Sequence, residues 1–88
     1  MWADHFIFSY ERDRLMHLYQ SHKTVEAAKI KYINGQVLHF ESGEYYAVTL
    51  EWLQKHEPRP GGYFVRYKDG YESYSPAEAF ESGYIRID

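Results

Sequence analysis

The sequence contains no cysteine among its 88 residues. Without thiols neither a disulfide framework nor a thiolate metal site can form, so the fold must be stabilised by packing alone. Long apolar runs are missing too, since the chain offers only short stretches such as Phe6–Phe8, whereas a membrane span needs about 20 residues. No basic segment followed by an apolar stretch opens the sequence. We therefore expect no signal peptide, no membrane contact and a location in the cytoplasm.

Positive charge is in short supply as well. The 10 Lys and Arg residues stand against 13 Asp and Glu, which gives a formal net charge of −3. A protein that follows the phosphates of a nucleic acid needs Lys and Arg clustered on one face. The charge balance therefore predicts no nucleic-acid partner.

Residues suited to catalysis or metal binding do not form a recognisable pattern. No two of the five histidines have the i, i+4 spacing that places two imidazoles on one helix face. His17 instead follows Asp13 by four residues, which predicts an exposed helix pair. Ser75 is expected to cap a helix, and no serine lies in a nucleophile-elbow sequence. We expect no enzymatic activity, no cofactor and no metal.

Aromatic side chains, by contrast, are abundant: ten Tyr, five Phe and two Trp make up 19% of the chain. A small domain buries a limited share of its surface, and wide side chains fill a thin core economically. We expect one domain, with residues 1–22 as an N-terminal extension and residues 23–88 as its core. Four aromatic residues occupy expected core positions: Tyr32, Phe40, Trp52 and Phe80.

The N-terminal extension predicts a helix over residues 10–22. This stretch has no Gly or Pro, and Ser9 is a suitable N-cap. Apolar or amphipathic residues recur at i, i+3, i+4 and i+7, which would place them on one helical face: Leu15, Leu18, Tyr19 and His22. Aromatic residues lie ahead of this helix and at its first position: Trp2, Phe6, Phe8 and Tyr10. They predict an apolar cluster that either packs on the domain or binds another chain, a second copy included.

Asn34-Gly35 is a strong hairpin signal between two strands, predicted at 25–33 and 36–41. A third short strand is predicted at 45–48. The pairing of the first two strands depends on the length of their loop.

A two-residue loop would place Lys31 opposite Leu38 and would mix polar and apolar residues on each face. A three-residue loop pairs Ile30 with Leu38 and Ala28 with Phe40. We favour the longer loop because register follows the buried face.

Thr49 is expected to cap a short helix over residues 50–56, in which Leu50 and Leu53 share a face with Trp52 at its edge. Pro58 is expected to end this helix. A second hairpin is predicted after this helix.

This second hairpin has strands at 63–67 and 71–74 around Asp69-Gly70. Its loop has either two or three residues, and both registers remain open. The three-residue loop would place Arg66 opposite Glu72, a favourable cross-strand pair.

Ser75, Pro76 and Glu78 form a capping-box pattern for another short helix, with Pro76 at its first position. Gly83 predicts a left-handed end for this helix, and residues 84–87 predict a last strand. The whole pattern predicts an α+β fold: a small, mostly antiparallel sheet of about five to six strands, an N-terminal helix and two short helices.

The second hairpin also carries the candidate binding residues, which are Tyr63, Arg66, Tyr67, Lys68, Tyr71 and Tyr74. Half-buried tyrosines of a thin core would explain this series. A binding face would explain it too, because Tyr supplies rigid amphipathic contact at low entropic cost. A nucleotide base stacked on that face is a weaker variant, with Arg59, Arg66 or Lys68 at its phosphate.

One long block, PGGYFVRYKDGYESYSPAEAFE at residues 60–81, resembles a group of small proteins encoded by tailed bacteriophages. The segments Lys23–Ile30 and Ser82–Ile87 share the resemblance, which covers about three quarters of the chain. The first 22 residues depart from it. The resemblance implies a phage origin and residence in the bacterial cytoplasm or the virion, and it implies no activity.

Three functions follow as hypotheses. The first is a non-enzymatic phage accessory protein that binds a host protein, such as a defence factor, and inhibits or modulates it. The second is a protein that binds and sequesters a small molecule, such as a nucleotide, with the second hairpin as one wall of the site. The third is a virion or assembly component that forms a homo-oligomer through its N-terminal aromatic residues.

Overall fold

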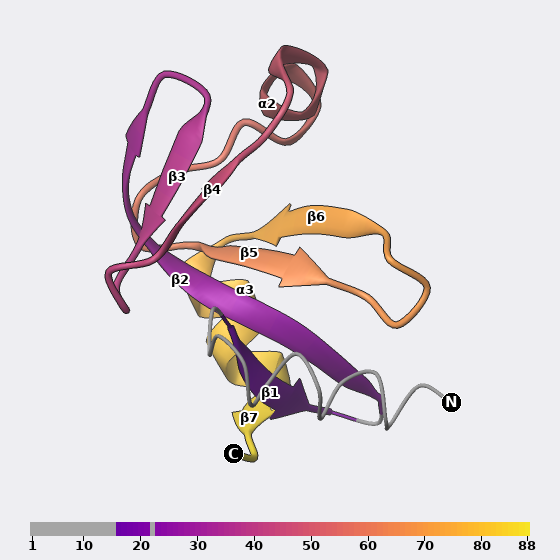
Figure 1. Ribbon diagram of the computed structural model, residues 1–88. Coiled ribbons are helices and arrows are strands. Elements are labelled where there is room, and N and C mark those ends of the chain that lie inside the picture. The colour runs from indigo at the N-terminus through magenta and orange to yellow at the C-terminus, as the bar shows by residue number, and fades with distance from the viewer. Residues whose placement is uncertain (1–15, 22) are drawn as a thin grey trace.

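A computed structural model describes residues 16–21 and 23–88 of the chain. Within these residues it forms a small α+β fold with an antiparallel sheet of seven strands and two helices (Figure 1). In chain order the elements are β1 (His17–Gln20), β2 (Thr24–Asn34), β3 (Val37–Phe40), β4 (Tyr45–Ala47), α2 (Leu50–His56), β5 (Tyr63–Arg66), β6 (Glu72–Ser75), α3 (Ala77–Gly83) and β7 (Ile85–Arg86).

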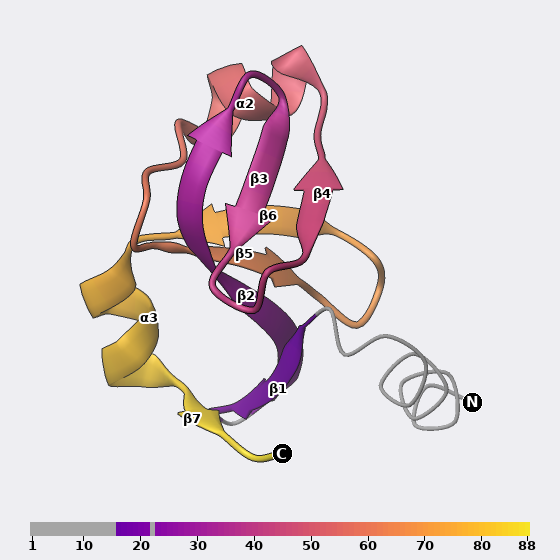
Figure 2. The same cartoon turned by 60° about the vertical axis from the view of Figure 1, so that its left-hand side comes forward.

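Strand β2 is the longest element, with 11 residues, and three other strands pair with it. Strands β1 and β3 follow one another along one edge of β2, and β5 occupies the opposite edge. Strand β2 curves strongly between these partners (Figure 2). We call the part ordered β7-β1-β2-β5-β6 sheet A, and the part ordered β2-β3-β4 sheet B.

Two hydrophobic clusters lie on opposite sides of sheet A. The first, between sheet A, sheet B and α2, is formed by Met16, Ala28, Ile30, Leu38, Phe40, Val48 and Phe64. The second, between sheet A and α3, is formed by Val25, Ala27, Tyr63, Val65 and Phe80. Burial of a Phe or Leu side chain contributes about 1.5–3 kcal/mol, so these clusters are the main source of stability.

Strand β2 has no solvated face along its first half because both of its sides face a cluster. Val25 and Ala27 point toward α3, whereas Ala28 and Ile30 point toward sheet B. Successive residues of a strand project to opposite faces. This double burial explains why residues 25–30 lack the polar alternation of a half-exposed strand.

The predicted helix over residues 10–22 is wrong where the structure describes it. His17–Gln20 forms strand β1, which pairs with β2 and with β7. Leu18 and Tyr19 are neighbours with partly buried side chains, and Tyr19 packs on the second cluster. Sheet pairing on two edges therefore overrides a helical pattern that four residues suggested. Residues 1–15 and 22 lie outside the described residues.

The register of the first hairpin differs from both alternatives because β2 contains a bulge. The observed pairs are Asn34 with Val37, Ile33 with Leu38, Tyr32 with His39 and Ile30 with Phe40, and the register shifts between Ile30 and Tyr32. The extra residue, Lys31, lets both Ile30 and Ile33 reach the first cluster, although a regular strand would point them to opposite faces. The predicted pairs of Ile30 with Leu38 and Ala28 with Phe40 are therefore wrong.

The second hairpin adopts the three-residue loop, and Arg66 pairs with Glu72 as that alternative requires. The backbone N–H of Tyr67 donates to the carbonyl of Tyr71 across 2.8 Å. Gly70 has a φ of +95°, a conformation that glycine adopts without strain.

Helix α2 has the predicted limits, and the amide of Trp52 donates to Oγ1 of its N-cap, Thr49, over 3.0 Å. Of the residues predicted for its apolar face, only Leu50 is misplaced. Leu50 is 59% exposed, whereas Trp52 and Leu53 pack on the first cluster. The helix ends at Glu57, which adopts the left-handed conformation one residue before Pro58.

The predicted capping box of α3 is wrong. Ser75 belongs to β6, Pro76 stands at the cap position, and no side chain caps the helix. Pairing of Ser75 with Tyr63 in the sheet takes the place of the cap. Gly83 is the last helical residue and does not adopt a positive φ.

Gly62 is a glycine because the ring of Tyr74 leaves no room for a side chain. A Cβ atom at this position would collide with the hydroxyl and ring carbons of Tyr74. The neighbouring backbone is fixed as well, since Ile30 exchanges hydrogen bonds with Gly61 and Gly62 at 2.7 and 2.8 Å. The Pro-Gly-Gly connector thus extends the pairing of β2 with β5.

We expect Gly62→Ala to lower the stability of the protein by about 1–3 kcal/mol, because an overpacked site must shift backbone or ring. This corresponds to a melting temperature lower by about 4–8 °C per kcal/mol. Gly83→Ala is the matched control, because nothing lies within 4 Å of a Cβ there, and it should change stability by less than about 1 kcal/mol. Equal melting temperatures for the two variants would contradict this account of Gly62.

Candidate functional site

The structure divides the six hairpin residues between two faces of sheet A. Tyr63 and Tyr67 face α3 and the second cluster. Tyr74 packs on the first cluster, and Arg66 lies over the rings of Tyr46 and Phe64 on that same side. The hairpin therefore does not present one continuous aromatic face.

Tyr63 is a core residue with only 6% of its surface exposed. Its ring stacks on Phe80 with centroids 4.3 Å apart, and its hydroxyl donates to Oε2 of Glu81 at 2.8 Å. Lys29 also binds this carboxylate, with Nζ 3.3 Å from Oε2. Burial, followed by the hydrogen bond to Glu81, raises the pKa of Tyr63 well above its ordinary value. The hydrogen bonds from Tyr63 and Lys29 hold the pKa of Glu81 below its usual value.

Arg66 is engaged in a polar network beneath α2. Its Nη2 and Nε each lie 3.0 Å from Oε2 of Glu72, and Nη1 lies 3.8 Å from Oε1 of Glu26. The hydroxyl of Tyr46 donates to the same Glu72 oxygen at 2.7 Å. Burial, together with this bond, raises the pKa of Tyr46. Trp52 of α2 donates from its indole to the carbonyl of Glu72 at 3.0 Å, so the network joins the helix to the sheet.

The accessible part of the hairpin is a patch of aromatic rings and lysines that we call the hairpin-tip cluster. It consists of Lys23, Lys55, Tyr67, Lys68 and Tyr71. The rings of Tyr67 and Tyr71 stack at 5.9 Å. Nζ of Lys23 lies 5.1 Å from the Tyr67 centroid, and Nζ of Lys55 lies 5.4 Å from the Tyr71 centroid. Tyr67, Lys68 and Tyr71 were predicted from the sequence, whereas Lys23 and Lys55 were not, because their segments reach the hairpin only in the folded chain.

A second group of aromatic side chains lies on the outer face of sheet B, and we call it the outer aromatic row. Tyr32, His39 and Tyr45 occupy paired positions on β2, β3 and β4. The rings of Tyr32 and His39 stack at 4.3 Å with an interplanar angle of 8°, and His39 and Tyr45 are 5.7 Å apart. Tyr32 is 48% and Tyr45 66% exposed, so the row faces solvent.

The expected core position of Tyr32 is thus wrong, whereas Phe40 and Phe80 are buried and Trp52 is partly buried. The bulge after Ile30 is the reason, because it turns Tyr32 away from the side that Ile30 and Ile33 share. The alternation of apolar and polar residues along a regular strand does not reveal such a bulge, so the sequence did not predict that Tyr32 faces outward.

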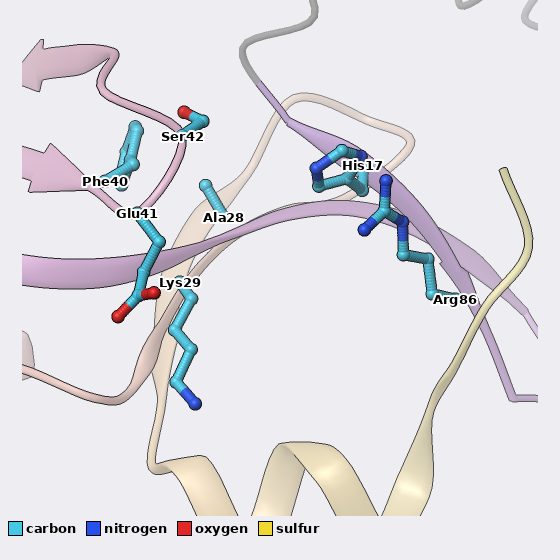
Figure 3. Close-up of a pocket in the computed structure, with 7 residues that line it drawn as sticks. All are labelled: His17, Ala28, Lys29, Phe40, Glu41, Ser42 and Arg86. Atoms are coloured by element: carbon cyan, nitrogen blue, oxygen red, sulfur yellow. The ribbon is translucent and has the colours of Figure 1, made fainter.

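A pocket of about 270 Å³ opens where β1 and β3 leave a gap along the edge of β2 (Figure 3). Its lining residues come from four strands and the β3–β4 turn: His17, Ala28, Lys29, Phe40, Glu41, Ser42 and Arg86. In Figure 3, His17 and Arg86 lie on one side of this space, and Glu41 and Ser42 on the other.

The basic side chains of this pocket lie close to carboxylates. Lys29 binds Glu81, and Nε of Arg86 donates to Oδ1 of Asp88 at 3.0 Å. Asp88 has a side chain only 4% exposed, and its Oδ2 lies 3.5 Å from Nδ1 of His17. Burial raises the pKa of Asp88, but hydrogen bonds from Arg86 and from the backbone of Leu18 outweigh it and hold the pKa below its usual value. The pocket therefore offers hydrogen-bonding groups of both signs without a strong net charge.

Other predicted residues are placed as follows. Tyr74 donates its hydroxyl to the carbonyl of Arg59 at 3.4 Å and packs against Gly62. The expected helix pair of Asp13 with His17 is wrong on its described side, because His17 lies in a strand. Trp2, Phe6, Phe8 and Tyr10, the candidates for binding a partner or a second copy, lie outside the described residues.

The described residues contain no group of three or more His, Asp or Glu side chains arranged to hold a metal ion. None of their helices is long and apolar enough to cross a membrane. No protein-family model, curated protein or solved structure matches the chain.

The raised pKa of Tyr63 predicts a loss of stability at alkaline pH. An unfolded tyrosine ionises near pH 10, whereas the folded chain retains the Tyr63 proton to higher pH. Above about pH 10 the unfolded state therefore binds fewer protons, and stability falls as pH rises. Tyr63→Phe should remove part of this fall, which urea unfolding between about pH 8 and 11 can measure.

Tyr45→Phe is the control for this experiment, because Tyr45 is exposed and its removed hydroxyl has no hydrogen bond within the described structure. Its stability should follow the wild-type pH dependence. A Tyr63→Phe variant with the same alkaline slope as the wild type would show that the Tyr63 hydroxyl is not held in the neutral form.

Proposed function

We propose that the protein is a non-enzymatic, phage-encoded accessory protein that binds a host protein and thereby inhibits or modulates it. The observation that carries this proposal is the outer aromatic row, in which Tyr32, His39 and Tyr45 form an exposed ladder over three strands. Aromatic residues with a polar end are enriched in protein interfaces and dominate their binding energy.

The row has the properties of a preformed contact surface. Its rings contact one another, so they lose little conformational freedom when a partner covers them. The underlying strands pack on the first cluster through Leu38, Phe40 and Tyr46, which fixes the positions of the rings. Val37 and Ala47, paired beside the row, extend it with small apolar side chains.

The resemblance of residues 23–87 to small phage proteins supports a host protein as the partner. Small accessory proteins without catalytic groups act by occupying a surface of their target. In the described residues the titratable groups with perturbed pKa values take part in structural contacts, as Tyr46 and Tyr63 do.

The two alternative functions have less support. A nucleotide stacked on the second hairpin would need free ring faces, yet Tyr63 is buried and Tyr67 and Tyr71 stack on each other. An oligomeric virion component would depend on Trp2, Phe6, Phe8 and Tyr10, which lie outside the described residues.

The proposal predicts that a Tyr32→Ala/Tyr45→Ala variant loses its host partner. The tagged wild-type protein should retain one host protein from a bacterial lysate in stoichiometric amount. The double variant should retain at least about tenfold less, because truncation of central interface aromatics costs about 2 kcal/mol or more. Retained protein is quantified by mass spectrometry, and melting curves verify that both chains are folded.

Leu50→Ala is the matched control, since Leu50 is a large apolar residue with 59% exposure at the start of α2 and lies outside the row. It should retain the partner as the wild type does. Absence of a stoichiometric partner, or equal retention by the double variant, would refute the proposal.

A further inference from the structure

Two lysines of the hairpin-tip cluster differ from other basic residues in what the described structure places beside their ammonium groups. Lys29, Arg66 and Arg86 each form an ion pair. Among the residues that the structure describes, Lys23 and Lys55 are in no such pair and lie instead over tyrosine rings. A ring attracts the positive charge but does not accept all three N–H bonds of an ammonium group. Both groups therefore keep donors available for an anion.

Three segments meet in this cluster, in a chain whose net charge is −3. Lys23 lies between β1 and β2, Lys55 in the last turn of α2, and Lys68 in the β5–β6 loop. The one carboxylate of that loop, Asp69, accepts a hydrogen bond from the backbone of Tyr71 at 2.9 Å. The loop projects from the end of sheet A, away from α3 (Figure 1).

His56, an imidazole on the same helix as Lys55, lies beside the cluster. His56 packs beside Tyr71 with ring centroids 6.3 Å apart. Burial, and then the nearby charge of Lys55, lowers the pKa of His56 below its ordinary value.

We propose that the hairpin-tip cluster binds an acidic segment of the partner protein, with Lys23 and Lys55 contacting its carboxylates. This inference rests on the proposed function, because it assumes that the partner is a protein. An extended segment advances about 3.3 Å per residue, so a few Asp or Glu residues reach both ammonium groups. Tyr67 and Tyr71 hold the two lysines in place and provide apolar contact between them.

An acidic peptide fits this cluster better than a single-stranded nucleic acid. Base stacking needs open ring faces, but Tyr67 and Tyr71 cover each other and carry lysines over their rings. A nucleic acid also brings a dense row of phosphates, which the net negative charge of the chain repels. A short segment with a few carboxylates can bind through the local positive charge of Lys23 and Lys55.

The test uses the full chain, labelled with ¹⁵N and titrated with a blocked peptide of six glutamates at about 50 mM salt, where screening is moderate. We expect saturable amide shifts confined to Lys23, Lys55 and residues 67–71. Lys23→Gln/Lys55→Gln should weaken binding about tenfold, in line with two exposed ion pairs. Lys31→Gln/Arg59→Gln removes the same charge from exposed positions outside the cluster and should bind as the wild type does.

The outcomes separate this inference from the proposed function. Tyr32→Ala/Tyr45→Ala should bind the peptide normally, so loss of the host partner in that variant does not affect the peptide result. A six-glutamine peptide that shifts the same amides equally would refute the inference. It would also be refuted by the absence of saturable shifts, by equal affinity in the two lysine variants, or by tighter binding of oligothymidine at the same amides.

Discussion

The double burial of strand β2 is the constraint on which the rest of the structure depends. Val25 and Ala27 face α3 while Ala28 and Ile30 face sheet B, so this one strand supplies side chains to both hydrophobic clusters. Its two edges are used as well, since β1 and β3 share one edge and β5 takes the other. Because the first half of β2 has packing partners on both faces and strand partners on both edges, it fixes where the neighbouring strands and α3 can lie. A polar side chain at a cluster-facing position would disturb two layers at once.

Local chemistry predicted the parts of the fold that depend on neighbouring residues. The limits of α2 follow from its N-cap, Thr49, and from Pro58, which stands just beyond its end. The second hairpin follows from its turn residues, Asp69-Gly70. Contacts between distant segments decided the parts that were mispredicted. Strand β1 is formed by pairing with β2 and β7, and a bulge at Lys31, which depends on how Ile30 and Ile33 pack, sets the first hairpin.

The candidate surfaces, too, depend partly on neighbouring residues and partly on contacts between distant segments. The sequence showed that the chain is rich in aromatic residues but left open which of them lie outside the core, and the structure places them. The tyrosines of the second hairpin were conspicuous in sequence because they are close together, yet Tyr63 belongs to the core. Tyr32 and Tyr45 were inconspicuous because 12 residues and two turns separate them, and only the paired strands bring them beside His39. Spacing along the chain is a poor guide to shared surfaces when a bulge changes the register.

The pairing of β7 with β1 has a consequence for how the chain folds. Tyr19 pairs with Arg86 and Gln20 with Ile85, so this ladder joins segments from opposite ends of the described sequence. Closing so long a loop costs more entropy than forming the local hairpins β2–β3–β4 and β5–β6. The hairpins should therefore form early, and the β1–β7 ladder should form late and open first. With β7 of only two residues, the edge of β1 would be the first part of sheet A to become available to another chain during folding.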